Sequence, residues 1–129
     1  EEAAKFFVEY VQNLIVLDAA PEAVLFDLIK YAESRIYPEN VVHLVQVGNC
    51  YDALWRRTGE KEYFDRAEEY YKRVLVIGPR LPQALYGLFD LYGTAGMAEK
   101  VEETGERILE IWPDDERVRG VLDEIRKSG

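Results

Sequence analysis

Short breaks at regular spacing are the feature that most limits how this chain can fold. Pro38 and Pro79 are 41 residues apart, and Pro79 and Pro113 are 34 residues apart. Between the breaks, apolar residues recur at helical intervals, and no strand-like alternation competes with them. The breaks predict about seven helices, over residues 3–17, 21–36, 41–58, 62–77, 82–92, 97–111 and 114–127. Because the connections are short, we expect successive helices to pack as antiparallel neighbours in an all-α protein.

The same order of residue types follows two of these breaks. Leu44 lies six residues after Pro38, and Leu85 lies six residues after Pro79. The next positions that agree are Val47, Gly48 and Tyr51 in one copy and Leu88, Phe89 and Tyr92 in the other. Before Pro79 and Pro113, the agreeing positions are Ala67, Tyr71 and Val74, and then Val101, Gly105 and Ile108. The first copy is longer by seven residues, about two helical turns, so the faces of its helices stay nearly in phase.

This pattern resembles the tetratricopeptide repeat family, whose unit of about 34 residues carries W-x2-L-G-x2-Y, then A-x3-F, then P. The first unit matches it with Leu44-x2-Val47-Gly48-x2-Tyr51, Ala67-x3-Tyr71 and Pro79, and the second keeps Leu88, Tyr92, Gly96 and Pro113. The second unit departs from the family at Phe89, where a small residue is preferred. It also departs at Val101, where the family prefers alanine, and at Gly105, where the family prefers an aromatic residue.

The resemblance implies a right-handed stack of antiparallel helical hairpins, a TPR-like α-solenoid. It also implies a single helical-repeat domain over residues 1–129. The expected parts are an N-terminal helical pair (1–40), a long repeat (41–81), a second repeat (82–115) and a C-terminal capping helix (114–129). In the capping helix, Gly120 costs about 1 kcal/mol relative to alanine, so we expect close backbone packing there.

In this family, the first helix of each hairpin lines a concave groove that holds a peptide. The groove residues carried over to this sequence are Val45, Asn49, Asp52 and Arg56 in the first unit and Gln83, Tyr86 and Asp90 in the second. Such a groove would hold an extended or helical peptide through Tyr86 and the polar side chains. The alternative is a concave face that is solvated and not used.

Charge and composition limit the other partners. The 129 residues carry a net charge of −9, which disfavours nucleic-acid phosphates and anionic membrane surfaces. The most apolar stretch, residues 6–29, contains four acidic residues, so we expect no membrane insertion. The chain begins with two glutamates and not with a basic signal segment, so we expect a cytoplasmic protein, and a monomer is favoured.

No set of residues predicts catalysis, a metal or a cofactor. His43 and Cys50 lie seven residues apart on one helix, about 10.5 Å along its axis, which is too far for a nucleophile and its base. We expect Cys50 to be an inert core thiol and His43 to lie at the surface or at an interface. Tyr70 and Tyr71 are adjacent on a helix, so we expect Tyr71 in the core and Tyr70 partly exposed.

The helix predicted over residues 97–111 carries a cluster of acidic residues. Its five glutamates, Glu99, Glu102, Glu103, Glu106 and Glu110, form a stripe. We expect this stripe to be a solvated face with local pairing to Lys100 and Arg107. A basic partner that docks on the stripe is the alternative.

The sequence therefore predicts a non-catalytic module that binds a protein or peptide. A first alternative is an engineered helical-repeat scaffold without a natural ligand. A second alternative comes from residues 10–18 and 24–26, which are weakly similar to the end of the membrane part of bacterial O-antigen ligase/polymerase-type proteins. This chain would then be the soluble tail of a membrane glycan polymerase or ligase, and an exposed apolar face on its first two helices would favour that origin.

Overall fold

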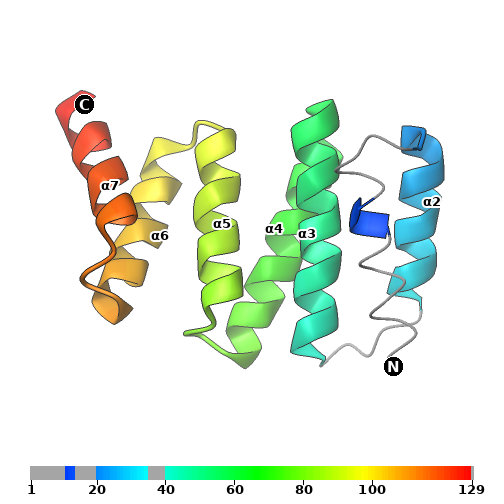
Figure 1. Ribbon diagram of the computed structural model, residues 1–129, viewed down its shortest axis with the longest axis horizontal. Coiled ribbons are helices and arrows are strands. Elements are labelled where there is room, and N and C mark those ends of the chain that lie inside the picture. Colours follow the sequence, from blue (N-terminus) through cyan, green and yellow to red (C-terminus); the bar gives the residue numbers. More distant parts are fainter. Residues whose placement is uncertain (1–10, 14–19, 35–39, 129) are drawn as a thin grey trace. The chain divides into compact units, whose positions relative to one another are not determined.

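The part of the chain that the structure describes is helical throughout its regular elements. The structure is a computed structural model that describes residues 11–13, 20–34 and 40–128 (Figure 1). The helices are α2 (Glu22–Glu33), α3 (Val41–Thr58), α4 (Lys61–Ile77), α5 (Pro82–Thr94), α6 (Ala98–Ile111) and α7 (Glu116–Ser128). Residues 11–13 are also helical, and the rest of the first predicted helix lies outside the described residues. The all-α prediction is confirmed, and the helix limits agree with those predicted to within a few residues.

The helix ends follow from local residue chemistry. Asn40 caps α3, because its side-chain oxygen accepts a hydrogen bond from the His43 backbone N–H at 3.2 Å. After α3, Gly59 has φ 74°, and before α6, Gly96 has φ 71°, a left-handed conformation that glycine adopts at low cost. Pro82 lies in the first turn of α5, where its missing N–H has no helical partner to lose.

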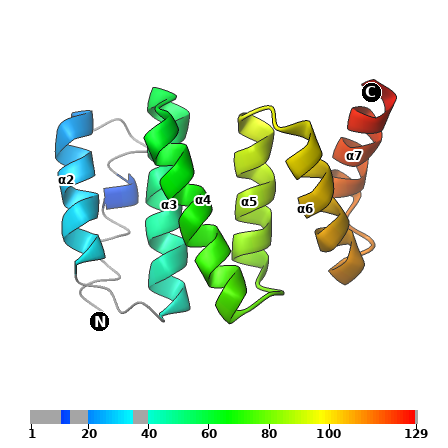
Figure 2. The ribbon, with the colours of Figure 1, turned by 180° about the vertical axis from the view of Figure 1, so that it is seen from behind.

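The chain divides into two compact units, Glu1–Pro79 and Arg80–Gly129. In the first unit, α3 packs along α4 and also contacts α2 (Figures 1 and 2). In the second unit, α6 packs between α5 and α7 in the order of the chain. This division lies close to the boundary that the sequence predicts between the repeats at 41–81 and 82–115.

Hydrogen bonds from tyrosine hydroxyl groups join α2 to α3 and α4. Tyr51 of α3 donates a hydrogen bond to Glu33 Oε1 at 2.7 Å, and Tyr70 of α4 donates to Glu33 Oε2. Tyr63 of α4 donates to Glu22 Oε2 at 2.8 Å, near the other end of α2. The Tyr51 ring lies 6.0 Å from the Tyr70 ring and 6.3 Å from the Tyr63 ring, centroid to centroid. Hydroxyl-to-carboxylate bonds therefore hold α2 at both ends, and packing between the rings holds the donating tyrosines of α3 and α4 together.

Each unit contains a close approach between two helices at a glycine. In the first unit, a Cβ atom on Gly48 of α3 would lie 3.1 Å from Tyr71 Cε1 of α4. In the second unit, a Cβ atom on Gly105 of α6 would lie 3.1 Å from Phe89 Cε1 of α5 and 2.8 Å from a methyl carbon of Leu122. The small residue is thus on the first helix in one hairpin and on the second helix in the other. The exchange accounts for Phe89 and Gly105 in the second unit, because the large ring fills the space that the glycine leaves.

Three expectations about single residues are wrong. His43 is only 2% exposed, because it lies on the same helical stripe as the buried Val47, and its Nδ1 has no hydrogen-bond partner among the described residues. Tyr70 is 7% exposed, because α2 covers it and supplies the acceptor at Glu33. Gly120 is exposed, and a Cβ atom there would meet nothing within 4 Å, so no close backbone packing explains it.

Two other expectations about the core are confirmed. Tyr71 is 1% exposed and Cys50 is 1% exposed. None of the helices in the described ranges is sufficiently long and apolar to cross a lipid bilayer.

Candidate functional site

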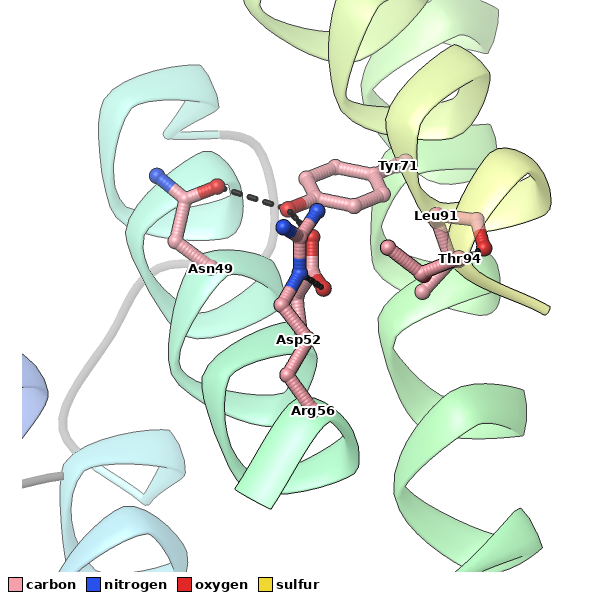
Figure 3. Close-up of polar contacts among 6 residues, drawn as sticks. All are labelled: Asn49, Asp52, Arg56, Tyr71, Leu91 and Thr94. Carbon is pink, nitrogen blue, oxygen red and sulfur yellow. Dashed lines mark hydrogen bonds and ion pairs between the residues drawn. The ribbon is translucent and has the colours of Figure 1, made fainter. Parts of the chain in front are cut away.

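Three of the four groove residues predicted on α3 form one polar network with a tyrosine of α4. Arg56 Nε donates to Asp52 Oδ1 at 2.8 Å, one helical turn back along α3. The Tyr71 hydroxyl lies 2.7 Å from Asn49 Oδ1 and 3.2 Å from Asp52 Oδ2, so its single proton faces two acceptors (Figure 3). Asn49, Asp52 and Arg56 follow one another at intervals of three and four residues, which places them on one face of α3. We call Val45, Asn49, Asp52 and Arg56 the α3 strip.

The α3 strip combines a buried carboxylate with an exposed guanidinium group. The Asp52 side chain is 11% exposed, whereas the Arg56 side chain is 47% exposed. Burial raises the pKa of the Tyr71 phenol well above its ordinary value, and the neighbouring Asp52 carboxylate raises it further. Tyr71 therefore stays protonated and donates to the strip at every physiological pH. Val45, one turn before Asn49, is 9% exposed and forms the apolar end of the strip.

The groove residues predicted on α5 have a different environment. The Tyr86 hydroxyl donates to Asp115 Oδ2, and Asp115 Oδ1 accepts from the Val118 backbone N–H at 3.0 Å, at the start of α7. Asp90 forms an ion pair with Arg117 at 3.0 Å. Gln83 is exposed at the start of α5. Tyr86 and Asp90 thus bind the beginning of α7, a use that the sequence analysis did not predict.

Tyr86 and Asp115 form a second polar cluster, in which the tyrosine is neutral and the aspartate is charged. Burial raises the pKa of Tyr86 to about 12, and the hydrogen bond to Asp115 acts in the same direction. The pKa of Asp115 is lowered by the Tyr86 hydroxyl and then by the Val118 backbone N–H. Trp112 completes the cluster, with its ring centroid 5.7 Å from that of Tyr86.

Sequence reasoning missed the roles that Tyr71 and Asp115 have in these sites, and also those of Trp112 and Arg117. A signal for Tyr71 was present, because a tyrosine in a core needs a polar partner for its hydroxyl group. For Asp115, the signal was its position just before α7, where an aspartate caps the first N–H groups of a helix. Neither signal identifies the partner on the other helix.

The described residues hold no group of three or more side chains that could bind a metal ion. Burial raises the pKa of the Cys50 thiol to about 12, which keeps it protonated and poorly nucleophilic. The acidic stripe on α6 pairs differently from the prediction. Arg126 of α7 contacts Glu102 and Glu106 at 3.0 Å each, and the Lys100 ammonium lies 5.5 Å from the Tyr92 ring centroid.

In comparisons with known proteins, no protein-family model matches this chain, and no curated protein matches it.

Raising the pH above 10 should destabilise the protein through its tyrosines. Burial raises the pKa of four tyrosines of the first unit above 10, namely Tyr51, Tyr63, Tyr70 and Tyr71. A phenol with a raised pKa in the folded state stabilises the fold below the unfolded pKa of 10, and this contribution is lost as the pH rises further. We expect the thermal midpoint to fall steeply between pH 10 and pH 12, as followed by helical circular dichroism.

Absorbance at 295 nm tests the same prediction by counting ionised phenols. Of the nine tyrosines, these four should ionise only when the helical signal is lost. Ionisation of all nine near pH 10, with the helical signal unchanged, would contradict the environments described above.

Proposed function

We propose that this protein is a non-catalytic peptide-binding module, and that the α3 strip is the part of it that contacts the peptide. The observation that carries the proposal is the network in which Tyr71 and Asp52 hold Asn49 and Arg56 on one face of α3. Side chains that are held in place before binding lose less conformational entropy when a ligand arrives. Val45 is buried at one end of the strip, so the exposed Arg56 at the other end is the charged group that the strip offers a peptide.

The proposed ligand is an extended or helical peptide with an acidic side chain opposite Arg56. A guanidinium group recognises carboxylates through planar N–H donors, and the Arg56 side chain is 47% exposed. The Asn49 amide group suits the polar groups of a peptide backbone. An acidic ligand must approach a chain of net charge −9, so we expect a modest affinity.

We further propose that α3–α4 and α5–α6 are two copies of a TPR-like hairpin, stacked in a right-handed solenoid. A glycine faces an aromatic ring at the same pair of repeat positions in both hairpins, with the two residues exchanged. This recurrence supports the proposal that the hairpins are copies of one unit. The stacking of the hairpins, the single domain and the concave groove remain predictions from the sequence pattern.

A displayed random-peptide library tests the binding function. We expect the full chain to enrich related acidic peptides, and a synthetic peptide of the enriched sequence to bind with a dissociation constant of micromolar order. Arg56→Ala should weaken that binding about tenfold or more, as expected for removal of a charged hydrogen-bond partner. The matched control is Lys72→Ala on α4, which removes the same charge from an exposed pair with Glu68.

Enrichment of no sequence, or equal loss of binding in both variants, would remove the α3 strip from the proposal. A substitution of another predicted groove residue, Tyr86→Lys, would not test the groove alone. It would also break the hydrogen bond from Tyr86 to Asp115.

The second candidate function is a helical scaffold without a ligand, such as an engineered one. The observation that favours it is that most of the predicted groove side chains already have contacts inside the chain. These contacts join Asn49 and Asp52 to Tyr71, Tyr86 to Asp115, and Asp90 to Arg117. A scaffold of this kind enriches no peptide in the experiment above.

A soluble tail of a membrane glycan polymerase or ligase is the remaining candidate. It predicts an exposed apolar face on the first two helices. On α2, Val24 is 48% exposed and Tyr31 is 50% exposed, seven residues apart on one face. Most of the first predicted helix lies outside the described residues, so this observation concerns α2 alone.

A further inference from the structure

We propose that α7 is a detachable cover on the second unit, which opens as one element while α5 and α6 stay folded. Its opening uncovers the edge of Phe89 and the notch at Gly105, against which Leu122 packs. This device is separate from the proposed peptide contact on α3, which lies in the other unit.

The buried contribution of α7 is small for its length. Of its 13 residues, only Val118 and Leu122 are buried. By comparison, α5 has the same length and buries six residues, namely Ala84, Leu85, Leu88, Phe89, Leu91 and Tyr92. An element with few buried apolar side chains opens at a lower free energy than the core around it.

The middle of α7 is also weakened from within. Gly120 lies inside the helix, is exposed, and has no neighbour within 4 Å of the place where a Cβ atom would be. Packing therefore does not compensate for the low helix propensity of this glycine. Near the C-terminal end of α7, an open hollow lined by Ala98, Glu124, Ile125 and Ser128 separates it from the first turn of α6.

Exposed charged groups hold much of the rest of α7 in place. Arg126 pairs with Glu102 and Glu106 of α6, and Arg117 pairs with Asp90 of α5, each at 3.0 Å. The side chains of Arg117 and Arg126 are both more than half exposed. Salt screens such pairs, so the closed position of α7 depends on ionic strength.

Native-state hydrogen exchange of the full chain tests the proposal. The amides of Val121 and Leu122, in the middle of α7, should exchange at least tenfold faster than those of Leu88 in α5 and Ile108 in α6. Sodium chloride at 1 M should accelerate the α7 amides several-fold and leave the α5 and α6 amides unchanged. The middle of the helix is chosen because the terminal turns of any helix fray.

A pair of glycine substitutions supplies the control. Gly120→Ala should slow exchange of the α7 amides about fivefold, the factor that corresponds to the difference in helix propensity between glycine and alanine. Gly93→Ala makes the same change in α5, where a Cβ atom also meets nothing within 4 Å, and should leave the α7 amides unchanged. One common exchange free energy for all three helices would overturn the proposal. So would a Gly120→Ala variant that slows all three helices equally or leaves α7 unaffected.

Discussion

Glu33→Ala should destabilise the protein by about 3 kcal/mol, although the residue is only half-buried at the end of α2. Its two carboxylate oxygens accept hydrogen bonds from Tyr51 and Tyr70. Those tyrosines are 0% and 7% exposed, so their hydroxyl groups have little access to water as an alternative acceptor. A buried hydroxyl group that loses its acceptor costs about 1–3 kcal/mol, and this substitution removes the Glu33 acceptor from two. Urea unfolding followed by helical circular dichroism measures the change in the free energy of unfolding.

The cause of this loss can be separated from the loss of an acidic side chain. In a Tyr51→Phe, Tyr70→Phe background, both donors are absent, and Glu33→Ala should then cost less than about 1 kcal/mol. Glu69→Ala on the exposed face of α4 is the matched control and should change stability by less than about 0.5 kcal/mol. A Glu33→Ala variant that costs the same in both backgrounds would show that the tyrosine hydroxyls do not hold α2.

Gly105→Leu should destabilise the second unit by about 3 kcal/mol. The Cβ atom alone would lie 2.8 Å from a methyl carbon of Leu122 and 3.1 Å from a ring carbon of Phe89. Leu122 can shift away from one added methyl group, but a leucine side chain also has to displace the ring of Phe89. Urea unfolding of a Trp55→Phe background, followed by the fluorescence of the remaining Trp112 and by helical circular dichroism, measures the loss.

Two further variants show whether space is the cause. Gly120→Leu makes the same replacement where no atom lies within 4 Å, and it should stabilise the protein by about 0.5–1 kcal/mol through helix propensity. Leu122→Ala creates a cavity and should cost about 2–5 kcal/mol alone, yet less in the Gly105→Leu background, where the new side chain fills the space. Strict additivity of these two substitutions would contradict the close approach at Gly105.

Much of the fold was predictable because it depends on residues close together in the chain. Helix limits follow from the positions of Pro79, Gly59 and Gly96, which act on their own backbone. The burial of Tyr71 and Cys50 was predictable from the positions that they occupy in the repeat pattern. Periodicity alone also places His43 on a buried stripe, but its imidazole suggested a surface position, and that interpretation was wrong.

The candidate site was only partly predictable. Asn49, Asp52 and Arg56 were correctly placed on one face of a helix, since their spacing determines this. Their connection through Tyr71 joins residues 19 and 22 positions apart, and the connection depends on how α4 is rotated against α3. The hydrogen bond from Tyr86 to Asp115 joins residues 29 positions apart, and no local pattern predicts that pair.

By itself, the order of amino acids determined the helices, their ends and the repeated hairpin pattern, because backbone preferences and apolar periodicity act within a few residues. Only the tertiary structure decided which polar side chains meet. It assigned Glu33 to two tyrosines and Tyr86 to the start of α7. The physical reason is that such contacts depend on the rotation and depth at which helices pack, which side chains distant in the chain set together.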